Sequence, residues 1–448
     1  MILVFWFSKG YLPLFCKMIY YIRVVMMTLS KDQLDARQTI LDWLNSKRRN
    51  SYLTMGGYAG TGKTSLIAEV RKSIPRSWRV AFCAYTGKAS GVMKNKLLDA
   101  EAVRCDDYVG TIHGLCYRVR KDPETKLNVF ERVPYLGYNF IIVDEASMVN
   151  KELFQDLRSY GIPMLFVGDH GQLPPISEDG FNLMSNPTVK LEEVHRFGSN
   201  AALLDLSVMA RNGEDIPFKA FDEKVAKVRE TDPMVNDFIL NHLRDFSNGV
   251  CLCGTNNTRV DVNQLIRTNY GVVQDFDDKV PRIGDRVVCL KNNKSLVEPI
   301  YNGMLGRITS LSEPDGNRNN CDALDGVYSM SVDVDDGFSY SGFVNKCHFG
   351  EMKHASDGKE FITVRELMKL KSKLTIAERK ALRKIGKRKV YFDSFDFGYC
   401  LTVHKAQGSE WGNVMLFEEV SGYWDDAYKS KWLYTAVTRS NDRLLIVS

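Results

Sequence analysis

The sequence lacks the cysteine spacing of a zinc site or of a disulfide framework. Its ten cysteines are scattered over 448 residues, with one C-x-C and no C-x-x-C pair. Tetrahedral zinc sites need clustered ligands, and secreted frameworks need closely set cysteines. The spacing therefore indicates free thiols in a reducing compartment, and we expect a cytoplasmic protein.

A clean apolar run of bilayer-spanning length is also missing. Residues 1–27 are apolar and aromatic, but three basic residues interrupt them, and they lack the basic start and small-residue cleavage site of a secretory signal. We expect this stretch to be an extension upstream of a true start near Met26 or Met27. A membrane anchor is the alternative, and we expect no membrane partner.

Charge of one sign does not dominate the chain. The 60 basic and 55 acidic residues give a formal net charge of +5, so a polyanion must be met by local patches. The length exceeds what one hydrophobic core usually serves, and 44% of residues are apolar. These values predict two principal domains with smaller insertions.

What the sequence does contain is the glycine-rich loop GYAGTGKTS at residues 57–65. A short apolar strand over 52–57 precedes it and a helix over 64–74 follows, which is the context that the G-x-x-x-x-G-K-[ST] pattern requires. Backbone N–H groups of such a loop wrap phosphates, while Lys63 reaches the β and γ phosphates and Thr64 ligates Mg²⁺. The residues expected to bind a nucleoside triphosphate here are Gly57, Ala59, Gly60, Thr61, Gly62, Lys63, Thr64 and Ser65.

Two further apolar strands end in polar residues. The run over 138–149 carries Asp144 and Glu145, where a Mg²⁺ carboxylate and a water-activating base are needed. The run over 162–176 carries Gln172, which either hydrogen-bonds the γ phosphate or its attacking water, or is an ordinary loop glutamine. Apolar strands separated by helices predict an α/β fold with a parallel sheet, whose carboxyl edge binds the ligand.

From about Leu29 to Val447, the order of motifs resembles that of superfamily 1 helicases, in particular the 5′→3′ branch that includes RecD-like enzymes and the phage Dda helicase. The most diagnostic stretch is GYCLTVHKAQGSEW at 398–411, and Glu410 within it is expected at the nucleotide. LSKDQLDARQ at 29–38 resembles the adenine-reading segment, which implies that Gln33 contacts the base. One position departs from the family, because Tyr58 stands where a smaller or different residue is expected.

The resemblance also implies two arginines at the γ phosphate and a set of residues that grip nucleic acid. LEEVHRF at 191–197 supplies Arg196, and WLYTAVTRSNDRLLIV at 432–447 supplies Arg439 as an arginine finger. The finger stabilises charge on the transferred phosphoryl group only when the two lobes close. The residues expected to bind a single strand are Thr86, Thr111, His113, Thr402, His404 and Lys405.

Two RecA-like lobes follow from the resemblance, the first over 28–197 and the second over 198–448. A β-hairpin pin is expected at about 106–138, where Tyr117 and Phe130 either form a strand-separating wedge or pack the hairpin onto the lobe. An SH3-like barrel is expected at about 306–397, with a hairpin turn at 336–337. The basic block over 363–389 is either a solvated face or a phosphate-binding surface.

The sequence thus predicts an ATP-dependent DNA helicase that moves 5′→3′ on one strand, with ATP and Mg²⁺ as cofactors. The alternatives are an RNA helicase of the same superfamily and a nucleotide-switched binding ATPase that displaces no strand. We expect single-stranded and forked DNA as partners and a monomer in bacterial or phage-infected host cytoplasm. Candidate protein partners are a single-strand-binding protein and replication, recombination or repair proteins.

Overall fold

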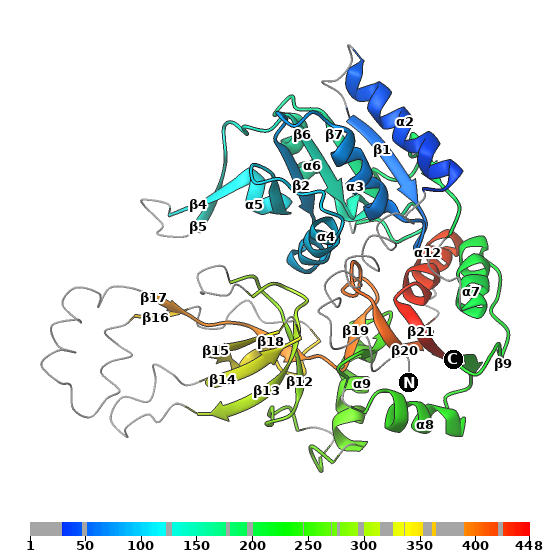
Figure 1. Cartoon of the computed structure of the whole chain (residues 1–448). Helices are drawn as coiled ribbons and strands as arrows, with labels where there is room; N and C mark the ends of the chain where they lie inside the picture. The colour runs from blue at the N-terminus through cyan, green and yellow to red at the C-terminus, as the bar shows by residue number, and fades with distance from the viewer. Residues whose placement is uncertain are drawn as a thin grey trace, which may run out of the picture.

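The computed structural model contains two parallel-sheet lobes and an antiparallel sheet beside the second lobe (Figure 1). The structure describes residues 29–46, 52–121, 128–175, 180–194, 200–244, 246–269, 271–275, 278–293, 300–313, 326–335, 337–352, 361–363, 389–419 and 424–448. The expected extension over 1–27 and nearly all of the basic block over 363–389 lie outside the described residues. Within the described residues, no helix is long and apolar enough to cross a membrane.

Lobe 1 is built on a six-stranded parallel sheet in the order β3-β2-β6-β7-β1-β8. Its strands are β1 (Tyr52–Gly57), β2 (Val80–Ala84), β3 (Tyr108–Thr111), β6 (Phe140–Asp144), β7 (Met164–Gly168) and β8 (Val189–Leu191). The central strands are buried on both faces, which is why they read as continuous apolar runs in the sequence. The predicted α/β class with a parallel sheet is confirmed.

Helices cover both faces of this sheet because successive strand residues point to opposite sides. Phe140 and Ile142 of β6 pack with α2 (Lys31–Asn45), α3 (Lys63–Ser73) and α4 (Gly87–Asp99). Ile141 and Val143 pack on the other face. The elements there are α5 (Ile112–Cys116), the 3-10 helix η1 (Ala146–Met148) and α6 (Lys151–Arg158).

Lobe 2 repeats the same layering with a sheet in the order β19-β11-β20-β21-β10-β9, parallel except for the edge strand β9. Its strands are β9 (Lys219–Ala220), β10 (Val225–Val228), β11 (Gly249–Cys253), β19 (Cys400–Thr402), β20 (Trp411–Phe417) and β21 (Ser440–Val447). One face carries α7 (Ala201–Asn212) and α12 (Asp426–Val437). The other face carries α8 (Pro233–His242) and α9 (Asn256–Asn269).

The antiparallel sheet beside lobe 2 has five strands in the order β15-β14-β13-β12-β18. Its strands are β12 (Arg286–Cys289), β13 (Leu305–Ser312), β14 (Val327–Val334), β15 (Phe338–Asn345) and β18 (Phe395–Phe397), and β16 (Phe361–Thr363) pairs with β17 (Lys389–Tyr391) separately. The 3-10 helix η3 (Lys346–His348) follows β15. Gly337, with φ of 90°, lies in the turn that joins β14 to β15, as the hairpin signal predicted. The first strand of the sheet precedes residue 306, where the accessory insertion was expected to begin.

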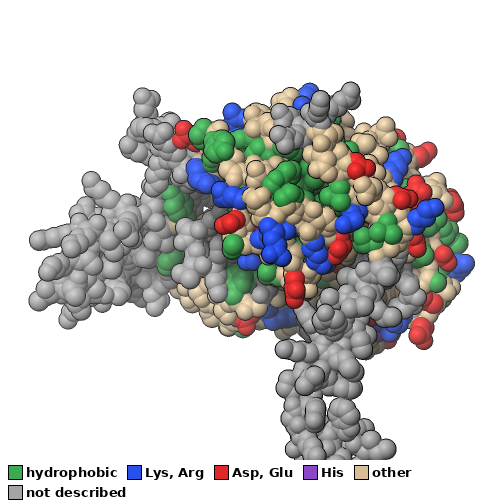
Figure 2. All heavy atoms as spheres, turned by 45° about the horizontal axis from the view of Figure 1, so that its top comes forward, with side chains coloured by type: hydrophobic (Ala, Val, Ile, Leu, Met, Phe, Trp, Pro, Cys, Tyr) green, Lys and Arg blue, Asp and Glu red, His purple; other side chains and the backbone are tan. Residues whose placement is uncertain are grey.

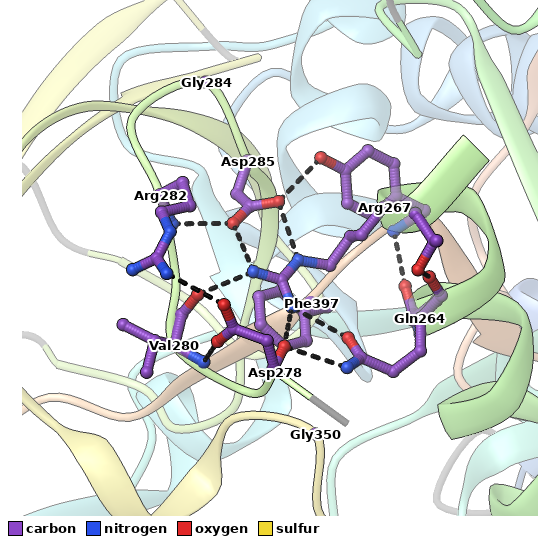
Figure 3. A network of polar contacts seen from close by, with 12 residues as sticks. Gln264, Arg267, Asp278, Val280, Arg282, Gly284, Asp285, Gly350 and Phe397 are labelled. Atoms are coloured by element: carbon purple, nitrogen blue, oxygen red, sulfur yellow. Dashed lines mark hydrogen bonds and ion pairs between the residues drawn. The ribbon is translucent and has the colours of Figure 1, made fainter. Parts of the chain in front are cut away.

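A buried polar network joins this sheet to α9 (Figure 3). Arg267 of α9 is fully buried, and its guanidinium contacts Asp285 with an N–O distance of 3.1 Å while lying 3.9 Å from the ring centre of Phe397. Tyr399 donates its hydroxyl to the same carboxylate at 2.9 Å. A second buried ion pair joins Arg259 of the same helix to Asp396 of β18. A buried charge is tolerated only when paired, so these contacts fix the antiparallel sheet to lobe 2.

A β-hairpin leaves lobe 1 on the side of the antiparallel sheet (Figure 1). Strands β4 (Tyr117–Lys121) and β5 (Asn128–Arg132) pair antiparallel, as the two predicted arms require. Tyr117 lies at its base, donates its hydroxyl to Asp156 of α6 and stacks on His113. These contacts favour the packing alternative for Tyr117, whereas the surroundings of Phe130 and the residues of the turn lie outside the described part of the chain.

Candidate active site

The glycine-rich loop lies between β1 and α3 and is shaped by two left-handed glycines. Gly60 and Gly62 have φ of 82° and 75°, a conformation that glycine adopts at little cost. A side chain at Gly57 would have its Cβ 2.6 Å from the Thr61 hydroxyl, so only glycine fits there. Lys63 begins α3, and its ammonium group donates to the carbonyl oxygens of Gly57 at 2.8 Å and Tyr58 at 3.0 Å. The loop thus curls around its own lysine, next to the N-terminus of a helix that favours anions.

Gln33 lies directly against this loop, although it is far away in sequence. Its side-chain amide donates to the carbonyl of Thr61 at 2.9 Å, and its oxygen accepts from the N–H of Ser30 at 3.1 Å, which closes a capping box at the start of α2. Gln33 is 6% exposed. The structure therefore shows it supporting the loop, and its contact with an adenine base stays a prediction.

The acidic pair at the end of β6 lies where the parallel strands end. Glu145 has φ of 54°, an uncommon left-handed conformation for a non-glycine residue. Its N–H donates to the Asp144 carboxylate at 2.9 Å. Burial, and then the neighbouring Asp144, raise the pKa of Glu145 to about 7, while Lys63 and Arg439 oppose that rise. Burial also raises the pKa of Asp144. A buried carboxyl group with a half-buried one beside it is suited to a cation and to proton transfer.

The end of β7 contributes Asp169 and Gln172, both buried. The side-chain amide of Gln172 lies 3.3 Å from the Asp169 carboxylate, and its oxygen has no hydrogen-bond partner among the described residues. A buried oxygen without a partner is costly, so it is suited to accept from a ligand or a water molecule. This finding favours the catalytic reading of Gln172 over that of an ordinary loop glutamine, although its role remains a prediction.

Arg439 lies at the boundary between the lobes, in the turn between α12 and β21. It is 3% exposed, and its guanidinium donates to the carbonyls of Thr435 at 2.9 Å and Ser409 at 3.0 Å and to the Thr438 hydroxyl at 3.0 Å. Its charge nevertheless reaches Glu145 of lobe 1 and lowers the pKa of that carboxyl group. The two lobes therefore bring a cation and the expected catalytic base together. Arg196 lies outside the described residues, and Glu410 is an exposed residue just before β20.

Three side chains of lobe 2 that we did not predict also reach the ligand-binding edge of lobe 1. The Tyr434 hydroxyl accepts from the N–H of Ala59 at 2.9 Å. Gln407 donates to the carbonyl of Leu173 at 3.0 Å, and the hydroxyl of Thr435 accepts from the N–H of Leu173 at 3.0 Å. All three lie inside motifs that the sequence had singled out. A tyrosine or a threonine on an apolar helix face is expected to pack in the hydrophobic core. The sequence pattern therefore did not distinguish Tyr434 and Thr435 from the core residues around them.

The residues of lobe 1 expected to bind nucleic acid begin two helices. Thr86 and Thr111 are N-caps whose hydroxyl oxygens accept from the N–H groups of Ala89 at 3.1 Å and Gly114 at 3.0 Å. Capping uses the hydroxyl as an acceptor, so its proton remains able to donate to a phosphate. His113 is exposed, and its ring lies 5.6 Å from that of Tyr117. These residues lie at the carboxyl ends of β2 and β3.

The corresponding residues of lobe 2 are more enclosed than an open binding surface would require. Thr402 ends β19. The His404 ring nitrogen lies 2.9 Å from the Tyr428 hydroxyl, and burial lowers the pKa of that histidine, which keeps the ring neutral. Burial lowers the pKa of Lys405 to about 8, against the opposing charge of Asp396. Lys405 therefore lies near the junction with the antiparallel sheet, and a phosphate contact from it stays a prediction.

Aromatic residues of lobe 2 and of the connection between β12 and β13 contact the start of α4 in lobe 1. A Cβ added at Gly87 would be 2.3 Å from the Tyr301 ring, and Lys88 lies 5.0 Å above the Trp411 ring. On the face of the molecule shown in Figure 2, where the top of Figure 1 is turned forward, basic and acidic side chains are interspersed.

Comparison with known proteins gives two family matches. Residues 28–232 match the family described as an AAA domain, and residues 397–447 match the UvrD-like helicase C-terminal domain. The ATP-dependent RecD2 DNA helicase of Deinococcus radiodurans is 26% identical over 438 residues, which cover 91% of this chain and 48% of the relative. The ATP-dependent DNA helicase dda of Enterobacteria phage T4 is 28% identical over 245 residues, which cover 49% of this chain and 53% of the relative. The chain thus spans about half the length of these two relatives.

Among solved structures, the crystal structure of a Bacteroides Pif1 bound to single-stranded DNA is similar in fold. It has a TM-score of 0.51 and 16% sequence identity, with 94% of this chain and 92% of the other chain covered. A second Pif1 structure, determined for DNA unwinding at forked duplexes, has a TM-score of 0.50 and 17% identity, with 94% and 92% covered. At this identity the likeness concerns the fold.

Proposed function

We propose that this chain, which belongs to the RecD- and Dda-like branch of superfamily 1 helicases, is an ATP-driven motor that moves 5′→3′ along single-stranded DNA and separates duplex DNA. The observation that carries the proposal is the meeting of the two lobes at one edge. Tyr434 and Thr435 of lobe 2 hydrogen-bond to Ala59 and Leu173 of lobe 1 at 2.9 and 3.0 Å. Arg439, which follows them in the chain, opposes the rise in the pKa of Glu145 of lobe 1. When a nucleotide binds to or leaves a site that both lobes form, the lobes can move relative to each other.

In the proposed hydrolysis, Lys63 and the loop N–H groups bind the phosphates, and Glu145 accepts a proton from the attacking water. Gln172 orients that water or the γ phosphate through its unpartnered side-chain oxygen or its amide. Arg439, and with it Arg196, stabilises the negative charge of the transition state from the second lobe. For this step Arg439 must exchange some of its present partners in lobe 2 for phosphoryl oxygens.

The residues present are suited to Mg²⁺. Thr64 and Asp144 supply one hydroxyl and one carboxylate, and Mg²⁺ commonly takes only one or two protein ligands beside phosphate oxygens and water. Within the described residues no group of three histidine, cysteine or acidic side chains forms a separate metal cage. When bound, the ion would neutralise charge on the β and γ phosphates.

The grip on DNA is proposed to alternate between the lobes. Hydroxyl and backbone donors around Thr86 and Thr111 would bind backbone phosphates in lobe 1, while Thr402, His404 and Lys405 would do so in lobe 2. Contacts of this kind position a strand without reading its sequence. Opening duplex DNA costs about 1.4 kcal/mol per base-pair step from stacking. We propose that hairpin β4–β5 serves as the pin and the antiparallel sheet as the SH3-like accessory domain that flank the fork.

The test is unwinding of two substrates that differ only in a 5′ or a 3′ single-stranded tail. We expect ATP-dependent strand displacement on the 5′-tailed substrate alone, and none with Lys63→Ala. Displacement on the 3′-tailed substrate alone would contradict the polarity. ATPase activity that is stimulated by single strands, with no displacement on either substrate, would instead support a nucleotide-switched binding protein. A parallel comparison of stimulation by DNA and by RNA of the same sequence separates the DNA and RNA motors.

A further inference from the structure

The Tyr434 hydroxyl of α12 connects the two lobes inside the expected nucleotide site. It accepts a hydrogen bond from the N–H of Ala59 at 2.9 Å and donates one to the Asp169 carboxylate at 2.8 Å. Tyr434 and Asp169 are each 1% exposed. The bridge therefore joins the glycine-rich loop, the polar end of β7 and a helix of the opposite lobe through one oxygen atom.

The group that Tyr434 contacts is one that phosphates normally use. Loops of the G-x-x-x-x-G-K-[ST] type bind phosphates through their backbone N–H groups and their lysine. Here the lysine ammonium donates to carbonyls of its own loop, and the Ala59 N–H donates to a hydroxyl from the other lobe. A tyrosine hydroxyl is a neutral oxygen acceptor at the end of a rigid ring, so it can satisfy this N–H as a phosphoryl oxygen would.

A second contact ties the loop to lobe 2. Arg211 of α7 lies 4.0 Å above the ring centre of Tyr58, the residue that departs from the family pattern. The His170 ring lies 4.3 Å away from the same tyrosine ring, and the Tyr434 ring lies 6.0 Å away. Two consecutive residues of the loop, Tyr58 and Ala59, are thus held from lobe 2, one through its ring and one through its backbone.

We propose that the Tyr434 hydroxyl competes with a phosphoryl oxygen of the nucleotide for the Ala59 N–H, so that nucleotide binding breaks a hydrogen-bonded bridge between the lobes. Tyr434 is then a positioning residue of the motor, and it links phosphate occupancy to contact between the lobes. This inference rests on the proposed function, because it requires that the loop binds a nucleoside triphosphate.

The test is the affinity of Tyr434→Phe for a slowly hydrolysed ATP analogue with Mg²⁺, measured by calorimetry without DNA. The substitution keeps the ring that packs against Gly171 and removes the competing oxygen, together with its hydrogen bond to the Asp169 carboxylate. Losing one competing hydrogen bond should lower the dissociation constant about two- to tenfold. An unchanged or higher dissociation constant would overturn the proposal.

Matched variants separate this competition from a general loosening of the lobes. Thr435→Val removes a different hydrogen bond between the lobes, the one to the N–H of Leu173, and should leave nucleotide affinity unchanged. Tyr58→Leu removes the ring that Arg211 covers without changing charge, and it should shift affinity in the same direction as Tyr434→Phe, which keeps the proposal testable if that variant does not fold. An equal gain in Thr435→Val would overturn the competition.

Lys63→Ala distinguishes this inference from the proposed function. It should lose most of its affinity for the analogue, because the loop then lacks the cation that neutralises the phosphates. If Lys63→Ala loses affinity while Tyr434→Phe and Tyr58→Leu both match the parent, the nucleotide site stands and the competition is overturned. If Lys63→Ala binds the analogue as the parent does, the nucleotide site itself is misassigned.

Discussion

The ammonium group of Lys63 lies 2.8 Å from the carbonyl oxygen of Gly57, the first glycine of its own loop. The lysine therefore holds the loop in a curled form that already surrounds the place of a phosphate. A cation in this position needs only to exchange carbonyl partners for phosphoryl oxygens, without a large change in the backbone. This preorganisation explains why the loop can bind a phosphate at low conformational cost.

Removal of that cation should abolish the motor and spare the grip on DNA. We expect Lys63→Ala to reduce single-strand-stimulated ATPase activity at least a hundredfold and to leave single-strand affinity within about twofold. The measurements are steady-state ATPase rates and fluorescence anisotropy of a labelled oligonucleotide. Lys72→Ala, on the exposed face of α3 and paired with Glu69, is the matched control and should behave as the parent.

The raised pKa of Glu145 predicts the pH dependence of hydrolysis. Its pKa is about 7, so below that pH the carboxyl group is largely protonated and cannot act as a base. The ATPase rate of the parent should increase as the pH rises from 6 to 8. Glu145→Gln should lose at least a hundredfold in rate and show no such increase. A parent rate that is flat across this range would contradict the assignment of Glu145 as the base.

The same shift predicts an effect on stability. The folded-state pKa of about 7 lies above the ordinary value of 4.5, so the folded protein binds more protons between these values and loses stability as the pH rises through them. Glu145→Gln, which stays uncharged, should melt a few degrees higher than the parent at pH 8 and at the same temperature near pH 4.5. Asp35→Asn, at an exposed position of α2, is the matched control for removal of one acidic charge. A gain in melting temperature that is equal at both pH values would argue against a raised pKa of Glu145.

Arg439 should matter for hydrolysis more than for nucleotide binding. Its guanidinium is engaged within lobe 2, and it acts on Glu145 across the boundary between the lobes. We expect Arg439→Ala to bind the ATP analogue within about threefold of the parent and to hydrolyse ATP at least about a thousandfold more slowly, in the range typical of an arginine finger. Single-turnover rates separate the two effects. Hydrolysis at the parent rate would exclude the finger role.

The network around Arg267 should carry a large share of the stability of lobe 2. Asp285→Ala leaves a fully buried guanidinium without its carboxylate, which typically costs about 3–5 kcal/mol. Glu351→Ala breaks the exposed pair with Lys279 and should cost at most about 1 kcal/mol. Urea unfolding of both variants gives the comparison. Equal losses of unfolding free energy in the two variants would show that the buried Arg267–Asp285 pair contributes no more to stability than the exposed pair.

The sequence predicted the elements that carry the site because parallel strands impose a strong pattern. The strand over 52–57 is confirmed to the residue, and the helix after the loop begins at Lys63, one residue before the predicted start. Asp144 ends β6 and Gln172 follows β7, two buried neighbouring strands of one parallel sheet, so their place at a common edge followed from topology.

Contacts that depend on the packing of distant segments could not be read in the same way. Tyr434 lies on a helix face that looks like ordinary core, and its partner Ala59 is 375 residues away along the chain. Lys405 follows a strand end, which suggests an open edge, but its side chain is enclosed in the folded chain, and burial lowers its pKa to about 8. The sequence did not show that the antiparallel sheet begins at Arg286, because a short apolar strand has the same residue pattern in a parallel and in an antiparallel sheet.

Two buried arginines of α9 form ion pairs with the antiparallel sheet and with the loop that enters it, so the sheet is expected to move together with lobe 2. Arg259 and Arg267 are two turns apart on one rigid helix, and each is bonded to a different aspartate of the sheet or the loop that enters it. When lobe 2 rotates by a small angle, the strands of this sheet that lie farthest from α9 would therefore move a greater distance than the strands next to α9.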